Sequence, residues 1–257
     1  MLVADLVNAM DALAPPALAE PWDNVGLVIG DRADELRSVL VTIDVSAEVI
    51  DEALGLGCTA LVAYHPPIFQ ALRSLGPADL ALSLARAKLS VYSPHTALDV
   101  APGGTNDVLA EALGLREVQV LRPTTPTGAG LGRVGLLAAP VRVAELVVKV
   151  KRALGIDHVL LAGRDDRMVD TLAVGAGAGA SLLEDTRRVG ADALVCGELG
   201  HHDALKAARL GLTALCTLHS NTERIALGSL AARLQATLGP QVPVHQSERD
   251  ADPFRVV

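Results

Sequence analysis

The chain has 257 residues and a formal net charge of −8, and half of its residues are hydrophobic although only 2% are aromatic. A chain of this length buries a core without disulfides or metals as staples, either as one large domain or as two modest ones. Because acidic and basic residues are interspersed, the sequence offers no basic surface for a polyanion and argues against a nucleic acid partner.

The first half of the chain predicts alternating strands and helices after an N-terminal helix. Apolar residues recur at helical spacing from Leu2 to Leu13, and Pro15 and Pro16 end that helix. Ser46 is placed to cap the next helix. Compact apolar runs predict strands, and amphipathic segments between them predict helices: the strands lie near residues 25–29, 39–43, 60–63 and 89–92, and the helices near 47–54 and 80–87.

The stretch from Arg122 to Gly132 is rich in Pro, Thr and Gly, and it predicts a domain boundary. We expect a first α/β half over residues 1–121, with the C-terminal part of the chain packing onto it, and a second α/β half over residues 122–257. Strands near residues 168–174, 193–196 and 213–218, separated by helical segments, repeat the order of the first half. The predicted fold class is therefore α/β, with two related halves in which helices pack on mixed sheets.

Both halves end their last strand in a histidine that is followed four residues later by a carboxylate. These pairs are His95 with Asp99 and His219 with Glu223. A further histidine, His65, follows the apolar run at 60–63 and precedes two prolines, which place it on a loop at the carboxyl end of a strand, where open α/β sheets bind their ligands.

Four of these residues are the candidate metal ligands: His65, Asp99, His219 and Glu223. Imidazole and carboxylate ligands suit Zn, Fe, Mn or Ni, and such mixed sets are common where one or two divalent ions activate water. A structural alternative for Glu223 is a carboxylate in the first turn of a helix capped by Asn221, where the helix dipole favours it.

Two other features suggest chemistry, each with a structural alternative of equal weight. Glu198 follows a predicted strand and a glycine, so it is a proton shuttle, an acceptor that orients a ligand, or a solvated loop carboxylate. Gly175, Gly177 and Gly179 could present backbone N–H groups to a phosphate, but their spacing matches neither common phosphate-binding motif, and a tight packing turn explains them equally well.

Five segments carry ordered motifs. They are Trp-Asp-Asn-Val-Gly-Leu at 22–27, Ala-Tyr-His-Pro-Pro-Ile-Phe at 63–69, Tyr-Ser-Pro-His-Thr-Ala-Leu-Asp at 92–99, Gly-Glu with His-His at 197–202, and His-Ser-Asn-Thr-Glu at 219–223. With these motifs the chain resembles, over nearly its whole length, the type-2 GTP cyclohydrolase I family of NIF-three-like proteins. The resemblance implies a dinuclear metal centre at the rim between two α/β domains, a homo-hexameric ring, and the ligands His65, Asp99, His219 and Glu223.

The chain departs from that family's pattern at Tyr64, where many members have the first histidine of a His-His pair. A neutral phenol with a pKa near ~10 is a poor ligand unless a metal lowers that value. His95 is an alternative source of the missing nitrogen, and it is also a candidate for proton transfer together with Glu198.

These residues support three functional hypotheses. The first is a metal-dependent hydrolase in which a divalent ion activates water and the small-molecule substrate is possibly a nucleotide such as GTP. The second is a non-catalytic metal-binding protein, a hexameric assembly or a regulator. A nucleotide-binding regulator that uses the glycine segment is a third and weaker reading.

The remaining sequence signals concern the compartment. Cys58, Cys196 and Cys216 show no Cys-x-x-Cys spacing and lie in or beside apolar runs, as buried thiols do in a reducing environment. No basic segment leads into an apolar stretch at the N-terminus, and no run approaches the roughly 18 apolar residues of a membrane span. We expect a cytoplasmic protein without a membrane partner.

Overall fold

Eleven strands form two mixed sheets in the computed structural model, which describes residues 1–257. Each sheet belongs to its own unit of the chain. Unit 1 comprises residues 1–101 and 227–251, and unit 2 comprises residues 102–226 and 252–257. Helices cover both faces of each sheet, so the predicted α/β class with mixed sheets is confirmed.

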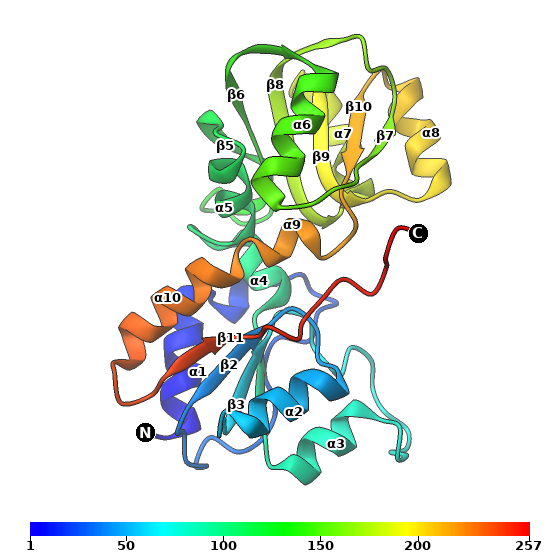
Figure 1. Cartoon of the computed structure of the whole chain (residues 1–257). Helices are drawn as coiled ribbons and strands as arrows, with labels where there is room; N and C mark the ends of the chain where they lie inside the picture. Colours follow the sequence, from blue (N-terminus) through cyan, green and yellow to red (C-terminus); the bar gives the residue numbers. More distant parts are fainter. The chain divides into compact units, whose positions relative to one another are not determined.

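The sheet of unit 1 has the order β1-β4-β3-β2-β11 (Figure 1). Four neighbouring strands run parallel and β1 runs antiparallel to β4 at one edge. The strands are β1 (Gly26–Ile29), β2 (Val39–Thr42), β3 (Ala60–Ala63), β4 (Ser90–Ser93) and β11 (Val244–Gln246).

Alternating side chains of this sheet bury two apolar layers. Val39 and Val41 pack with α1 (Val3–Leu13) and α10 (Leu227–Leu238), whereas Leu40 packs with the helices of the opposite face, α2 (Ala47–Gly55) and α3 (Leu80–Ala87). Figure 1 shows the two helix pairs on the two sides of the sheet. The short η1 (Pro16–Leu18) and α4 (His95–Val100) complete unit 1.

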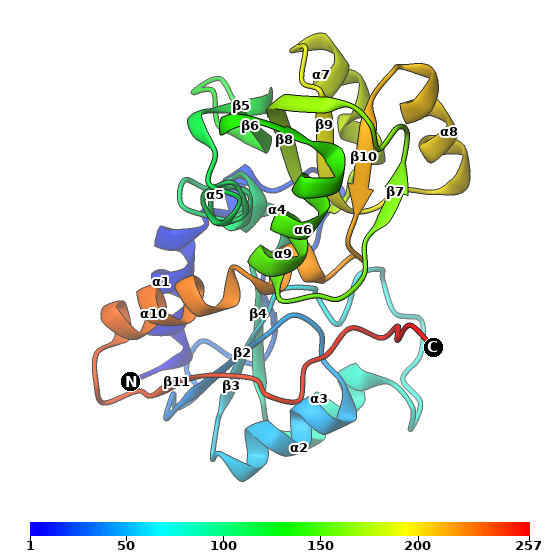
Figure 2. The ribbon, with the colours of Figure 1, turned by 45° about the horizontal axis from the view of Figure 1, so that its top comes forward.

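The sheet of unit 2 has the order β5-β6-β8-β9-β10-β7 (Figure 2). Its three parallel strands are β8 (Met168–Ala178), β9 (Ala193–Glu198) and β10 (Thr213–Cys216). The antiparallel strands beside them are β5 (Arg116–Pro123), β6 (Gly130–Arg142) and β7 (Leu160–Ala162).

Two helix pairs also cover this second sheet. One apolar layer joins the sheet to α5 (Thr105–Ala112) and α6 (Val143–Leu154). The other joins it to α7 (Leu183–Arg188) and α8 (His201–Arg209). The short η2 (Ala180–Leu182) precedes α7, and α9 (Asn221–Arg224) follows β10.

The predicted repetition within the chain is confirmed by the topology. Unit 1 contains β2-α2-β3-α3-β4 and unit 2 contains β8-α7-β9-α8-β10, with the three strands of each set parallel and adjacent in the same order. In both sets a histidine follows the third strand, so the same strand ends carry the candidate chemistry of the two units.

The division of the chain differs from the predicted boundary at 121/122. The stretch rich in Pro, Thr and Gly is the turn of the β5–β6 hairpin, where Thr124 N donates to Ala129 O (2.9 Å). A Cβ at Gly130 would lie within 3 Å of Arg122 backbone atoms, so this hairpin requires glycine there. The chain passes to unit 2 at 101/102 instead, because Leu109 and Leu113 around α5 pack in the core of unit 2.

After α9 the chain leaves unit 2 and contributes α10 and β11 to unit 1, and residues 252–257 belong to unit 2 again. All three cysteines are buried and free. No helix combines the length and the apolar character that crossing a membrane requires.

Candidate functional site

In unit 1, His65 lies just beyond the carboxyl end of β3 and is oriented by a neighbouring loop. Its Nδ1 donates to Asp44 Oδ1 (2.9 Å), and its backbone N–H donates to Ile43 O (3.0 Å). Asp44 follows β2, the neighbouring parallel strand, so adjacent strand ends bring the two side chains together. With the Nδ1 proton directed to a carboxylate, Nε2 carries the lone pair that binds metals.

Asp99 is buried in α4, where the Tyr64 hydroxyl donates to its Oδ1. Tyr64 is buried as well, and its carbonyl accepts from Ser93 Oγ (2.8 Å). Tyr64 therefore orients the carboxylate of Asp99.

His95 begins α4 with a φ of +28°, an uncommon conformation for a residue with a side chain. Its Nδ1 donates to Asp23 Oδ1 (2.8 Å), and Thr96 N donates to Asp23 Oδ2 (3.1 Å). Burial raises the pKa of the Asp23 carboxyl, but the hydrogen bonds from His95 and Thr96 outweigh it, so the net pKa lies below its usual value. An ionised Asp23 therefore holds the His95 ring.

Aromatic rings surround His95. The ring centroids of His65 and Tyr64 lie 5.3 Å and 5.9 Å from that of His95, and those of Trp22 and Phe69 each lie 6.1 Å away. Trp22 and Phe69 are both exposed, at 59% and 50% of their full accessible surface. In a chain with five aromatic residues, three of them gather around this histidine.

In unit 2, His219 follows β10 and lies between two carboxylates. Its Nδ1 is 3.1 Å from Glu198 Oε1, and its Nε2 is 3.3 Å from Glu223 Oε1. Glu223 is buried in α9, whereas Glu198 is exposed at the end of β9. The bond to Glu223, opposed by burial and reinforced by Glu198, raises the pKa of His219 to about 9.

Gly177 leaves the space that this pair occupies. It has a φ of +60°, and a Cβ at this position would lie 2.6 Å from Glu223 Oε1 and 3.1 Å from His219 Nε2. Its N–H donates to Thr222 Oγ1 (2.9 Å), which in turn donates to the carbonyl of His219 (3.0 Å). The end of β8 is thus fitted to the turn that carries both candidate ligands.

The glycine segment expected between a strand and a helix is, in the structure, mostly strand. β8 continues through Gly175 and Gly177 to Ala178, with an irregular pairing to β9 between Gly175 and Ala178. A Cβ at Gly175 would lie 2.4 Å from Leu182 Cδ1, and one at Gly179 would lie 2.5 Å from Cys196 Sγ. Close packing accounts for these glycines, which favours the packing turn of the two alternatives.

These residues fit divalent metal ions by the chemistry of their donors. Asp99 and Glu223 are buried carboxylates, and the Nδ1 atoms of both candidate histidine ligands face carboxylates. Within unit 2, His219 and Glu223 offer a ring nitrogen and a carboxylate oxygen 3.3 Å apart. Nitrogen and oxygen ligands of this kind suit Zn and neighbouring first-row ions.

Two carboxylates important to this arrangement, Asp23 and Asp44, were not predicted from the sequence. Asp44 does follow a predicted strand, and Asp23 does lie in the Trp-Asp-Asn motif, so each had a local signal. Their partners lie 72 and 21 residues away along the chain, and no spacing rule connects them. The strand order had to be known first.

Comparisons with known proteins find relatives over the whole length of the chain. The family described as Duf34/NIF3 (NGG1p interacting factor 3) matches residues 1–253. A Clostridium perfringens protein named GTP cyclohydrolase 1 type 2 homolog is 29% identical over 262 residues, covering 100% of both chains. The NIF3-like protein 1 of Drosophila melanogaster is 34% identical over 266 residues, covering 99% of this chain and 89% of that protein.

The fold has a close match among solved structures. A Bacillus cereus protein related to NIF3 aligns with a TM-score of 0.94 at 24% identity, covering 100% of this chain and 99% of that chain. At this identity the likeness concerns the fold.

Proposed function

The chain belongs to the Duf34/NIF3 family, and on that premise we propose that it binds divalent metal ions through His65 and Asp99 of unit 1 and His219 and Glu223 of unit 2. One observation carries the proposal. His219 directs Nε2 toward the buried carboxylate of Glu223 while Glu198 faces its Nδ1. Metal-binding histidines are commonly held in this way by a carboxylate on the other ring nitrogen.

The proposed reaction is a metal-dependent hydrolysis. A divalent ion held by these ligands would act as a Lewis acid and would lower the pKa of a water molecule toward neutrality. Glu198 holds His219 in orientation. His95, with Nδ1 on Asp23, accepts or returns a proton at Nε2, as an imidazole held by a carboxylate does in general acid–base catalysis.

The proposed substrate is a nucleotide, with GTP as the first candidate. This proposal rests on the relatives named GTP cyclohydrolase 1 type 2 homolog, one of which matches this chain over its full length. The family resemblance also leads us to propose a cytoplasmic homo-hexamer with one or two ions of Zn, Fe, Mn or Ni in each chain.

Turnover by metal-loaded protein tests the reaction. Protein stripped by a chelator is reloaded separately with Zn²⁺, Mn²⁺, Fe²⁺ or Ni²⁺ and assayed against GTP, other nucleotides and phosphoesters. We expect turnover only after reloading, and we expect His95→Gln to slow it by about 10²–10⁴-fold while the metal is retained. Binding of metal without turnover of any substrate would reject the hydrolase and leave the non-catalytic role.

A further inference from the structure

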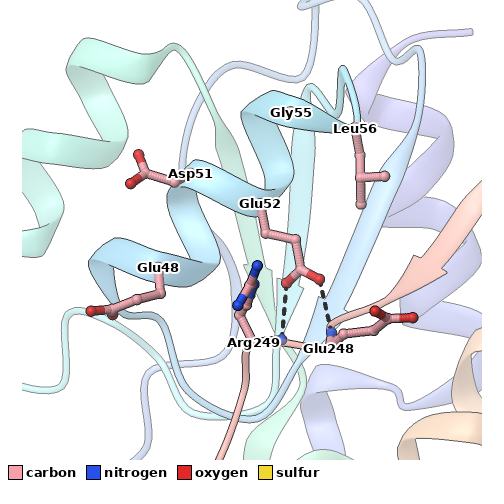
Figure 3. A pocket seen from close by; sticks show the side chains of 7 residues that line it. All are labelled: Glu48, Asp51, Glu52, Gly55, Leu56, Glu248 and Arg249. Atoms are coloured by element: carbon pink, nitrogen blue, oxygen red, sulfur yellow. Dashed lines mark hydrogen bonds between the residues drawn. The ribbon is translucent and has the colours of Figure 1, made fainter.

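The chain segment after β11, Ser247 to Asp252, is held against α2 by one carboxylate; we call it the C-terminal strap. Glu52 of α2 accepts hydrogen bonds from Ser247 Oγ and from the backbone N–H groups of Glu248 (2.8 Å) and Arg249 (3.4 Å). Figure 3 shows Glu52 pointing at these two backbone nitrogens in a hollow lined by α2 and the strap. Burial opposes ionisation of Glu52, but these bonds lower its pKa below the usual value.

Within unit 1 the strap reaches the loop that orients His65. Asp250 Oδ2 accepts from Ile43 N (3.1 Å), and Asp250 Oδ1 lies 3.5 Å from Asp44 N. The backbone N–H of Asp250 donates to Ser247 Oγ (3.0 Å), which fixes its own position. Asp44 Oδ1 in turn accepts from His65 Nδ1. Asp250 therefore helps to fix the orientation of the His65 ring by holding the backbone of Asp44.

Within unit 2 the strap reaches the turn that carries the other ligand pair. Asp252 Oδ2 accepts from Ser220 Oγ (3.0 Å), and Ser220 is buried between His219 and α9. The carbonyl of Ser220 accepts from the backbone N–H of Glu223 (3.1 Å), so this serine belongs to the turn that sets the path from His219 to Glu223. Asp252 therefore helps to fix the positions of His219 and Glu223 through its hydrogen bond with the Ser220 hydroxyl.

We propose that Asp250 and Asp252 are positioning residues for the two candidate ligand pairs, Asp250 for His65 and Asp252 for His219 with Glu223. The inference rests on the metal-binding function proposed above. Only Ala251 separates the two aspartates, so a single short segment serves both pairs.

The test uses the full-length protein and three variants, Asp250→Ala, Asp252→Ala and Glu248→Ala. Glu248→Ala is the matched control, because Glu248 contacts Glu52 through its backbone and keeps that bond. Co²⁺ affinity is measured by competition with a chromophoric chelator, and the Co²⁺ absorption spectrum reports the ligand geometry. We expect each aspartate variant to bind Co²⁺ about 10–100-fold more weakly and to change the spectrum, as loss of residues that orient metal ligands does. The control should match the wild type.

A second readout needs no metal. In chelator-treated protein, the rate at which diethylpyrocarbonate modifies each histidine is followed by mass spectrometry. We expect Asp250→Ala to increase the rate at His65 several-fold with His219 unchanged, and Asp252→Ala to do the reverse. This selectivity separates positioning from general loss of stability, which would expose both histidines.

The outcomes separate the two proposals. If the wild type binds no Co²⁺ but the selective modification pattern holds, the metal-binding function fails and the positioning role stands. If Co²⁺ binding, spectrum and modification rates are unchanged in both aspartate variants, the positioning role is overturned. Asp250→Asn and Asp252→Asn replace either alanine variant that does not fold, since each keeps one oxygen acceptor and removes only the charge.

Discussion

Three histidines of this chain share one arrangement, in which Nδ1 faces a carboxylate: His65 with Asp44, His95 with Asp23, and His219 with Glu198. The carboxylate fixes the ring and the tautomer, and it leaves Nε2 as the basic nitrogen. The same contact between Nδ1 and a carboxylate occurs in both units. It therefore does not depend on the conformation of a single loop.

Removing the carboxylate that orients His65 should weaken metal binding, although all four proposed metal-binding side chains remain in place. We predict that Asp44→Ala raises the Kd for Zn²⁺ by about 10–100-fold, measured by calorimetry in competition with a chelator. Asp51→Ala, which removes an exposed carboxylate of α2, is the control and should leave the Kd unchanged. Equal Kd values for the two variants would contradict the role of Asp44.

Metal binding should depend on pH through His219. Its pKa is raised to about 9 in the metal-free protein, so the ring is protonated at neutral pH and a metal must displace that proton. We predict that Zn²⁺ affinity rises about tenfold per pH unit between pH 7 and pH 9 from this residue, with one proton released per ion. Calorimetry in buffers of different ionisation enthalpy counts the proton, and His219→Gln should reduce the count by one.

The same shift has the opposite consequence for the stability of the metal-free protein. A raised pKa means that the folded state holds the proton more tightly than the unfolded state, whose histidine pKa is near ~6.5. The stabilisation by protonated His219 is therefore complete below about pH 6.5 and is lost as pH rises through about 9. Urea unfolding of the wild type and of His219→Gln across this window should converge at high pH.

At the scale of elements, the end of β8 determines whether the ligand pair of unit 2 forms. We predict that Gly177→Ala displaces Glu223 and lowers metal affinity at least tenfold, because the new Cβ falls 2.6 Å from Glu223 Oε1. The positive φ adds a strain of roughly 1–2 kcal/mol. Gly190→Ala is the matched control, with a φ of +75° and open space around the added Cβ.

The two glycine variants separate strain from displacement. Both should lose free energy of unfolding in urea through the strained φ, with the larger loss in Gly177→Ala because it also displaces Glu223 from His219. Only Gly177→Ala should lose metal in a chelator competition. A Gly177→Ala protein that binds metal as well as Gly190→Ala would show that the space beneath Glu223 is not required.

Short apolar runs bounded by turn residues predicted the central strands well, since β2, β3, β9 and β10 are buried throughout most of their length. The hairpin of β5 and β6 was missed because the Pro, Thr and Gly of its turn also suit a linker. The helix α10 and the strand β11 were not predicted as elements, although the buried leucines of α10, at positions 227, 230, 234 and 238, recur at helical spacing.

The candidate site was predicted in part. The types and spacing of His219 and Glu223 suggested a pair, and the structure places Nε2 of the histidine 3.3 Å from the carboxylate. The roles of Asp23, Asp44 and Gly177 depend on which strand ends are neighbours, and a single sequence does not contain that information.

At the scale of the whole molecule, the chain enters unit 2 after Ala101, returns to unit 1 for α10 and β11, and ends in unit 2. Neither unit is therefore one continuous segment. We predict that Leu234→Ala, which truncates a fully buried side chain of α10, destabilises unit 1 by about 2–5 kcal/mol. Leu205→Ala, at a half-exposed position of α8, should cost far less in the same urea titration.

The proposed oligomer is tested by mass in solution. Light scattering coupled to gel filtration should give six times the chain mass of 26.6 kDa. If the ions are catalytic rather than structural, His219→Ala should lose metal and keep that mass. Dissociation of the variant to smaller species would favour the assembly role.

The central claim, that His65, Asp99, His219 and Glu223 bind divalent ions, is tested most directly by counting metal in purified protein. Inductively coupled plasma mass spectrometry is applied to the wild type and to Asp99→Ala and His219→Ala after loading with Zn²⁺ and gel filtration. The account predicts one or two ions per chain in the wild type and a clear loss in both variants. A wild type that retains no metal, or variants that retain as much as the wild type, would contradict it.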